Sequence, residues 1–442
     1  MTTAQAILAL LTLAALGSTV FWSAVLIEMV WLLLHLPTAR SGIALAKTLD
    51  PAAAPSVCLI IPAYNEAASI ATVARSLMAQ DYPRLHVVFA LDRCTDATDS
   101  ILRSVIGADP RFTIFPITSC PADWSGKVHA VWRAASDSAP ARAAEILTFA
   151  DADVEFDPAC IGACAALLRT RNLGLLSLLS SLSNEHWFEK VVQPVAGYEL
   201  MRQFPPRRVN RGQNRRPLAN GQFMMFTRGA YDSFGGHGNP QVKDELLEDI
   251  ALAKRVKWEG FDANVLPAAG MLTVRMYESY GQFAEGWRRI FSELAHRRPR
   301  RLRSYALQLF VTDVFLPLIS LAGFAYAALT LIDLPGERGR GEPATLWIAL
   351  AALLAGFLGF ALMHLVVALG CRWARAPLSI TWLHFPGSIA VVHILLRAAR
   401  DLELRRPVRW GGRMYQREPR YEGDEKFPRT LLGFRAPGAA SH

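Results

Sequence analysis

The chain has 442 residues, a formal net charge of +9 at pH 7, and 52% hydrophobic residues. Its mean hydropathy of +0.21 is high for a soluble protein, and the apolar residues gather near the two ends, which favours membrane insertion. The length leaves room for one large catalytic domain besides the membrane segments. A basic chain can also bind nucleic acid, but these arginines cluster beside apolar segments, where anionic headgroups account for them, and no nucleic-acid module motif is present. We therefore expect no nucleic-acid partner.

The first predicted element is an apolar helix from about Ala6 to Leu36, interrupted only by Glu28. No Lys or Arg precedes it, whereas a cleaved signal peptide needs a basic leader and a much shorter apolar core. We predict a retained transmembrane anchor over residues 1–40, long enough to tilt or to project at one end. Glu28 lies towards the inner end, where a hydrated carboxylate is the simpler interpretation and a functional one the alternative.

The central region, from Ser56 to about Gly270, alternates short β-rich runs with helical patterns, as a mostly parallel α/β sheet does. We predict strands at Val57–Ile61 and in the runs HVVFALD, RFTIFPI and EILTFADAD. The first helix places four apolar side chains on one face: Ile70, Val73, Leu77 and Met78. In such sheets ligands bind at the carboxyl ends of the strands, and the polar insertions of this chain fall there.

Acidic residues follow several of these strands. Asp151 and Asp153 form a D-x-D pattern at a strand end, where two carboxylates can reach one Mg²⁺ or Mn²⁺ ion, although an acidic pair can also merely solvate a loop. Glu248 and Asp249 open a helix, where a carboxylate can also be a cap or a dipole partner. The loops after the first two strands carry further polar side chains: Asn65, Glu66, Asp92 and Asp96. Four such loops in one sheet favour a shared site.

These motifs carry a family resemblance. PAYNEA, DRCTDAT, DAD, GQFMMFTRGAYDSFGGH and LEDIALA, in this order and spacing, resemble the membrane-anchored family 2 glycosyltransferases over roughly Ser56 to Arg301. The resemblance implies the GT-A fold, a mostly parallel α/β sheet flanked by helices, here with N- and C-terminal transmembrane helices. NGQFMMFTRGAYDSFGGH and VRMYESYGQFAEGWRRIF look most similar to bacterial carotenoid and hopene-associated glycosyltransferases, and ceramide glucosyltransferase is more distant. The tail PVRWGGRMY resembles a W-x-G-R-x-Y ending of some bacterial members.

The same resemblance assigns a donor pocket for a nucleotide-diphosphate-sugar, with a UDP-sugar favoured. Ala63, Asn65 and Glu66 would line the nucleotide pocket, and Asp92 would contact the base or ribose. Lys127, in DWSGKVHA, matches a family lysine that approaches the diphosphate. The alternative interpretation is that Lys127 is an ordinary exposed lysine.

The resemblance also separates a metal site from a base. Asp151 and Asp153 correspond to the metal motif, with Asp153 the more direct ligand of Mg²⁺ or Mn²⁺, and Asp249 matches the catalytic base of inverting members. Glu248 would orient Asp249 or cap the helix. Base and metal site must be separate carboxylates, because the acceptor attacks from the face opposite the departing diphosphate.

One motif departs from the processive relatives, which carry Q-x-x-R-W on an interfacial helix. GQFAEGWRRIF contains Trp287 and Arg288, but the spacing differs. These two residues would border the acceptor or diphosphate site, and membrane anchoring explains them equally well. The absence of the Q-x-x-R-W spacing and the small number of predicted transmembrane helices argue against a polymer-extruding synthase. Both favour the transfer of a single sugar to a lipid.

Three apolar stretches follow: Ala306–Ile332, Ala344–Leu369, and Leu378–Leu396, the last broken by His384, Pro386, Gly387 and His393. The Lys/Arg bias beside the spans predicts that the catalytic domain lies in the cytoplasm, with the connection GERGRGEP outside. The resemblance to bacterial members implies that the membrane is a bacterial inner membrane. The basic tail is also expected inside, but three complete crossings after the catalytic domain would place it outside. The last stretch is therefore re-entrant or interfacial, unless the Lys/Arg bias does not predict orientation here.

We thus predict a catalytic domain over 55–303 with interfacial helices near 278–300, membrane helices over 304–398 and a cytoplasmic tail over 399–442. The basic loop Pro205–Pro217 would cover the donor, rest on headgroups, or be simply solvated. The predicted function is an inverting transfer of one sugar to a hydroxyl of an isoprenoid, carotenoid or sphingolipid-like lipid. A processive transferase, a metal-dependent phosphohydrolase and a non-catalytic nucleotide-sugar sensor remain alternatives.

Overall fold

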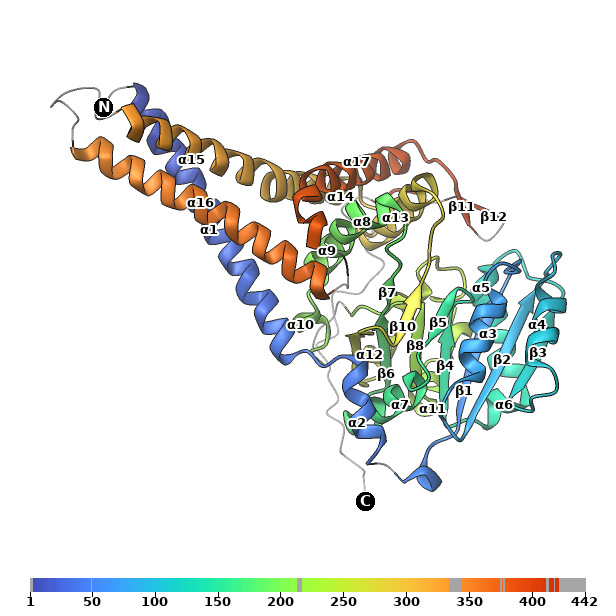
Figure 1. The fold of residues 1–442 in the computed structure, drawn as a ribbon. Helices are drawn as coiled ribbons and strands as arrows, with labels where there is room; N and C mark the ends of the chain where they lie inside the picture. Colours follow the sequence, from blue (N-terminus) through green and yellow to red (C-terminus); the bar gives the residue numbers. More distant parts are fainter. Residues whose placement is uncertain are drawn as a thin grey trace, which may run out of the picture. The chain divides into compact units, whose positions relative to one another are not determined.

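The computed structural model describes residues 3–48, 50–212, 217–333, 343–373, 376, 378–410, 413–416 and 418–420. The predicted connection GERGRGEP is almost wholly outside these residues, as are part of the basic loop 205–217 and most of the tail. The chain forms two compact units, whose ribbon is drawn in Figure 1. The sheet unit comprises the described residues of Pro37–Ser183, Phe204–Tyr277 and Arg405–His442, and the helical unit those of Met1–Leu36, Asn184–Gln203 and Glu278–Leu404.

The sheet unit is built on seven strands in the order β3-β2-β1-β4-β8-β6-β9. Strands β3, β2, β1 and β4 are mutually parallel, whereas β8 runs antiparallel to both β4 and β6. The seven strands are β1 (Val57–Ala63), β2 (Leu85–Asp92), β3 (Phe112–Ile117), β4 (Ile146–Ala150), β6 (Leu175–Leu179), β8 (Phe223–Thr227) and β9 (Ala263–Pro267). A small second sheet contains β5 (Val154–Phe156), β10 (Leu272–Val274) and β7 (Ser181–Leu182). The predicted mostly parallel α/β sheet is confirmed.

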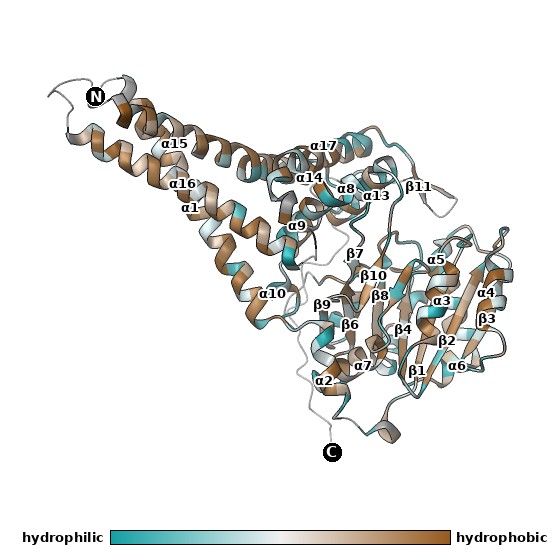
Figure 2. Cartoon of the chain, viewed as in Figure 1, coloured by the Kyte–Doolittle hydropathy of each residue, from teal (hydrophilic) through white to brown (hydrophobic). Residues whose placement is uncertain are grey.

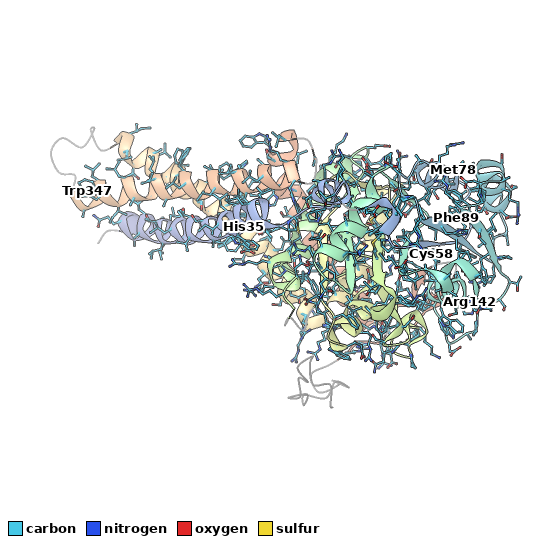
Figure 3. The ribbon with its side chains drawn as sticks, turned by 90° about the horizontal axis from the view of Figure 1, so that it is seen from below. His35, Cys58, Met78, Phe89, Arg142 and Trp347 are labelled. Atoms are coloured by element: carbon cyan, nitrogen blue, oxygen red, sulfur yellow. The ribbon has the colours of Figure 1, made fainter. Side chains whose placement is uncertain are left out.

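Helices cover this sheet, which explains why its strands read as unbroken apolar runs. Cys58 and Phe89, labelled in Figure 3, lie in β1 and β2 and are fully buried. The predicted apolar face of the first helix is also confirmed, since Ile70, Val73 and Leu77 are buried. The helices of this unit are α2 (Gly42–Ala46), α3 (Ile70–Met78), α4 (Thr98–Ile106), α5 (Gly126–Asp137), α6 (Ala139–Ala143), α7 (Cys160–Thr170), α10 (Pro206–Val209), α11 (Arg228–Asp232) and α12 (Glu248–Trp258).

The strand register positions the acidic loops. In β1, Ile60 pairs with Val88 of β2 and with Phe149 of β4. Because these three strands are parallel, the segments after Ala63, Asp92 and Ala150 leave the sheet at the same edge, as the sequence pattern predicted.

The helical unit contains the long apolar helices. In the part of the chain that the structure describes, four helical segments are long and apolar enough to cross a membrane: Gln5–Ala46, Pro299–Ile332, Ala344–Trp373 and Thr381–Glu403. Its elements are α1 (Thr3–His35), α8 (Trp187–Val191), α9 (Gln193–Gln203), α13 (Tyr280–Leu294), α14 (Pro299–Phe310), a π-helical turn (Val311–Phe315), α15 (Leu316–Asp333), α16 (Pro343–Trp373) and α17 (His384–Glu403). The apolar helices predicted near both termini are therefore present.

Small residues bring α1, α15 and α16 together. A Cβ added at Gly356 of α16 would lie 2.6 Å from the carbonyl oxygen of Ser320 in α15, and one at Gly359 would lie 3.2 Å from Ser18 Oγ of α1. Glycines allow such close backbone approach, which is how helices associate where lipid removes the hydrophobic driving force.

Two packing features of the helical unit were not predicted from the sequence. The stretch Leu378–Leu396 forms a short 3₁₀ helix (Leu378–Leu383) followed by α17, and Pro386 lies in the first turn of α17, where its missing N–H costs no helical hydrogen bond. Residues 184–203, between β7 and β8, pack with the apolar helices rather than with the sheet. There Gly387 permits the close approach, since its Cβ would lie 2.2 Å from the carbonyl oxygen of Val191.

Candidate active site

Lys127 joins two acidic segments that are far apart in the sequence. It lies in the first turn of α5, and its Nζ is 2.7 Å from Asp151 Oδ1 and 2.7 Å from Glu248 Oε1. Burial lowers the pKa of Lys127, but the two carboxylates outweigh this and raise the pKa above its ordinary value. The lysine thus stays charged and connects the D-x-D segment after β4 to the start of α12.

Asp249, the next residue of α12, is held by two backbone groups. The Gly221 N–H donates to its Oδ2 (2.9 Å), and the Ile250 N–H donates to its Oδ1 (2.7 Å). Burial and the adjacent Glu248 charge raise the pKa of Asp249 to about 7, while Lys127 and the two N–H groups lower it. A carboxylate with a pKa near neutrality is suited to accept a proton from an alcohol.

Gly221 is a site residue that the sequence analysis did not single out. A Cβ at this position would lie 3.2 Å from Lys127 Nζ and 3.5 Å from both Asp249 Oδ2 and Glu248 Oε1. A side chain at this position would therefore crowd Lys127, whose ammonium group would have to shift. The signal was the dipeptide Asn220-Gly221 before β8, where Asn220 is itself fixed by its N–H donating to Ser177 Oγ (2.8 Å).

Asp153 has the properties of a metal ligand. Its Oδ1 is buried and has no hydrogen-bond partner in the described part of the chain. Burial and the nearby Asp151 and Glu66 carboxylates raise its pKa to about 7, against the opposing charge of Lys127. This excess of hard oxygen donors fits Mg²⁺ or Mn²⁺, which take one or two carboxylates and complete their shell with water and phosphate. Within the described residues, no three His, Cys, Asp or Glu side chains form a preassembled metal cluster.

The loop after β1 is locked to the loop after β2. Asn65 has a left-handed backbone (φ 55°), and its Oδ1 accepts a hydrogen bond from the Thr95 N–H (2.8 Å). The backbone N–H of Glu66 donates to Thr98 Oγ1 (2.8 Å). Burial raises the pKa of the Glu66 carboxyl, and Asp151 adds to the shift. Ala63 is buried at the end of β1. Among these predicted pocket residues, the Glu66 side chain lies near the D-x-D segment, whereas Asn65 fastens the two loops.

Asp92 is buried and already paired. Arg93 binds it with two nitrogens, Nε to Oδ1 at 2.8 Å and Nη2 to Oδ2 at 2.6 Å. The Arg93 guanidinium also lies over the ring of Tyr64, with 5.7 Å between Cζ and the ring centroid. Arg93 has φ 51°, a strained conformation for a residue other than glycine. A nucleotide base that reaches Asp92 would therefore also meet Arg93 and Tyr64, which the sequence analysis missed although both adjoin quoted motif residues.

Trp287 and Arg288 lie in α13 of the helical unit. The Trp287 ring is buried between Phe283 and Phe291, and Arg288 Nη1 lies 2.6 Å from Asp401 Oδ2 in α17. These contacts hold α13 and α17 together. The placement of the two residues beside an acceptor stays a prediction.

The sheet topology and this cluster of charged groups define a glycosyltransferase of the GT-A fold. The chain belongs to the family described as glycosyltransferase like family 2, whose model matches residues 54–300. A comparison with curated protein sequences gave no significant match.

Among solved structures, the chain is similar to a mannosyltransferase, PcManGT, from Pyrobaculum calidifontis, in complex with GDP-Man and Mn²⁺. The identity is 20%, the TM-score 0.46, and the match covers 91% of this chain and 99% of that one. It is also similar to residues 1–349 of TarS from S. aureus, at 14% identity and a TM-score of 0.39, covering 83% of this chain and 97% of that one. A third is glucosyl-3-phosphoglycerate synthase from Mycobacterium tuberculosis, in complex with Mn²⁺, UDP and phosphoglyceric acid. That match has 16% identity and a TM-score of 0.36, and it covers 59% of this chain and 83% of that one.

Proposed function

We propose that this protein is an inverting glycosyltransferase that moves one sugar from a nucleotide-diphosphate donor, preferably a UDP-sugar, to a hydroxyl of a membrane lipid. The observation that carries the proposal is the Lys127 bridge between Asp151 and Glu248. It brings the D-x-D segment, suited to a metal-bound diphosphate, next to the residue that precedes Asp249. A donor site and a base thereby belong to one charged cluster.

Asp249 acts as the base in this mechanism. Its carboxylate accepts the proton of the acceptor hydroxyl while the oxygen forms a bond to the anomeric carbon. The bond from that carbon to the diphosphate breaks, and its electron pair leaves with the phosphate oxygen, so the configuration inverts. The Gly221 and Ile250 N–H groups fix the orientation of the carboxylate, and Lys127 offers a positive charge to the departing diphosphate.

Asp153 and Asp151 are the residues that would hold Mg²⁺ or Mn²⁺. The buried, unpartnered Asp153 Oδ1 and the crowding of negative charge around it support this assignment. A bound divalent cation supplies positive charge that stabilises the leaving diphosphate. Asp151 is paired with Lys127, so a bound cation would share this carboxylate with the lysine.

The acceptor is proposed from the membrane helices and from the resemblance of NGQFMMFTRGAYDSFGGH to carotenoid and hopene-associated enzymes. An isoprenoid, carotenoid or sphingolipid-like hydroxyl at the membrane surface is then the substrate. The Lys/Arg bias supports a cytoplasmic sheet unit on a bacterial inner membrane. The altered Q-x-x-R-W spacing favours a single transfer over polymer extrusion.

A labelled-sugar assay tests the proposal. Protein purified in detergent is incubated with radiolabelled UDP- or GDP-sugars, a membrane lipid extract, and Mg²⁺ or Mn²⁺. We expect labelled lipid with the wild type only when the cation is present. Asp249→Asn should lose lipid labelling yet still bind nucleotide. The control Asp137→Asn removes an exposed carboxylate at the far end of α5 and should remain active.

Other outcomes identify the alternatives. Full lipid labelling by Asp249→Asn would refute the base assignment. Labelled sugar 1-phosphate without labelled lipid indicates a phosphohydrolase, and nucleotide binding without turnover indicates a sensor. A ladder of lengthening products indicates a processive enzyme. Mass spectrometry of the labelled lipid identifies the acceptor.

A further inference from the structure

Polar groups gather at two levels along the long helices of the helical unit. At one level, Gln5 of α1 donates to Thr345 Oγ1 of α16 (2.9 Å). At the other, His384 Nε2 lies 3.1 Å from Asp313 Oδ1, and the His384 ring packs at 6.4 Å from Trp22 of α1. Figure 3 labels Trp347 near the first end of the bundle and His35 beyond the second.

The separation of these levels matches a bilayer. From Gln5 to Trp22 in α1 and from Thr345 to His364 in α16, the helices rise about 25–29 Å at about 1.5 Å per residue. The hydrocarbon core is ~30 Å thick. His364 belongs to the second level, since its ring lies 4.6 Å from Trp382. Aromatic and imidazole side chains gather at such a boundary because their rings suit the headgroup region.

Helix α17 begins at this second level and runs away from the core alongside α14. Contacts near its two ends show the direction: His384 meets Asp313, whereas Glu403 Oε2 meets Arg303 Nη2 at 2.7 Å. It is therefore antiparallel to α14, which precedes Asp313 in the chain, and α15 extends from Asp313 in the opposite direction. A second ion pair, Arg288 with Asp401, ties α17 to α13.

The exposed face of α17 suits the headgroup boundary rather than the hydrocarbon. It carries Ile389 and Leu396, which are seven residues apart and 54% and 46% exposed. Trp382, 68% exposed, lies just before α17 in a short 3₁₀ helix (Leu378–Leu383). His393, exposed on the same face at the middle of the helix, has no hydrogen bond or ion pair among the described residues. In a spanning helix this imidazole would face lipid at the bilayer centre, which is costly. Figure 2 shows α15 and α16 brown along most of their length, whereas α13 and α17 carry more teal.

We infer that α17, although long and apolar enough to span, does not cross the membrane but starts at the headgroup boundary and runs beside α14 outside the hydrocarbon core. The exposed Trp382 and Ile389 meet lipid at that boundary, and the exposed Arg397 and Arg400, further along the helix, suit anionic headgroups. The membrane is then crossed three times, by α1, α15 and α16. After the sheet residues, the chain crosses the membrane at α15 and returns at α16. The residues that follow α16, namely α17 and residues 405–420, therefore lie on the same side of the membrane as the sheet unit. This inference is independent of the proposed reaction.

Nitroxide depth measurements test the inference. The partly exposed Cys94 and Cys120 are replaced by serine in the full-length chain, and the spin label is attached to Ile389→Cys, His393→Cys or Leu396→Cys. The protein is reconstituted in phosphatidylethanolamine–phosphatidylglycerol vesicles. Leu321→Cys and Leu354→Cys are matched controls, because both are exposed near the middle of spanning helices. We expect all three α17 labels to be shallower than both controls.

A label at position 393 as deep as the one at position 354 would overturn the inference. Sidedness provides an independent measurement that needs no substitution in α17. In a chain that retains Cys120, Arg420→Cys is added, and sealed vesicles are treated with a membrane-impermeant maleimide. Labelling of both cysteines from the same side supports three crossings, and labelling from opposite sides excludes them.

Discussion

The pH dependence of sugar transfer tests the Asp249 assignment most directly. Burial and Glu248 raise the pKa of Asp249 to about 7. Only the ionised carboxylate accepts a proton, so its active fraction rises about tenfold between about pH 6 and about pH 8. An aspartate with an ordinary pKa of ~3.9 would be ionised throughout this range and would give no change.

The assay must separate the base from the metal site, because the pKa of Asp153 is also raised to about 7. We therefore measure kcat for lipid labelling with saturating donor and cation, so that only groups that titrate in the loaded enzyme contribute. Asp249→Glu keeps a carboxylate and should retain a pH-dependent residual rate, whereas Asp249→Asn should be uniformly inactive. A wild-type kcat that stays constant across this range would refute the reasoning.

Three further substitutions test contacts within each unit, two in the sheet unit and one in the helical unit. Lys127→Met removes the cation that lowers the pKa of the base, so the acidic limb of the kcat profile should move to higher pH and activity at neutral pH should fall at least about tenfold. Gly221→Ala inserts a methyl group 3.2 Å from the lysine Nζ and should reduce kcat about tenfold or more in a folded protein, whereas Gly229→Ala, whose Cβ meets nothing within 4 Å, should be neutral in activity. Gly387→Ala forces a methyl group to 2.2 Å from a backbone oxygen and should destabilise the helical unit by about 1–3 kcal/mol. Thermal unfolding in detergent checks this, with Gly17→Ala, which has open space, as the control.

Stability should also depend on pH through Asp249. Its pKa is raised on folding, so the folded state holds the proton at pH values where the unfolded state has released it. Stability from this group is complete below about pH 4 and declines as the pH rises to about 7. Asp249→Asn lacks this decline, so its Tm relative to wild type should increase between about pH 5 and about pH 8. An unchanged difference would mean that the carboxylate is not buried in the folded protein.

The local features of this protein were predictable from the sequence. Apolar runs of strand length, the helical face of Ile70, Val73 and Leu77, and the polar loops after the strands are encoded by neighbouring residues. Short-range patterns are sufficient because burial on one face imposes a period of about two or 3.6 residues whatever the rest of the chain does. Motif order was enough to predict the family and the α/β fold.

Only the tertiary structure decided which of these groups meet. Lys127 could reach many carboxylates, but the placement of α5 and α12 on one sheet selects Asp151 and Glu248. The packing of residues 184–203 with apolar helices left no sequence pattern. The Asn220-Gly221 dipeptide marked a turn but not its contact with Asp249. For the last apolar stretch, the charge bias favoured a re-entrant or interfacial segment, and the structure adds that α17 packs along α14. Such contacts depend on how all the core side chains pack at once, and a one-dimensional pattern does not contain that information.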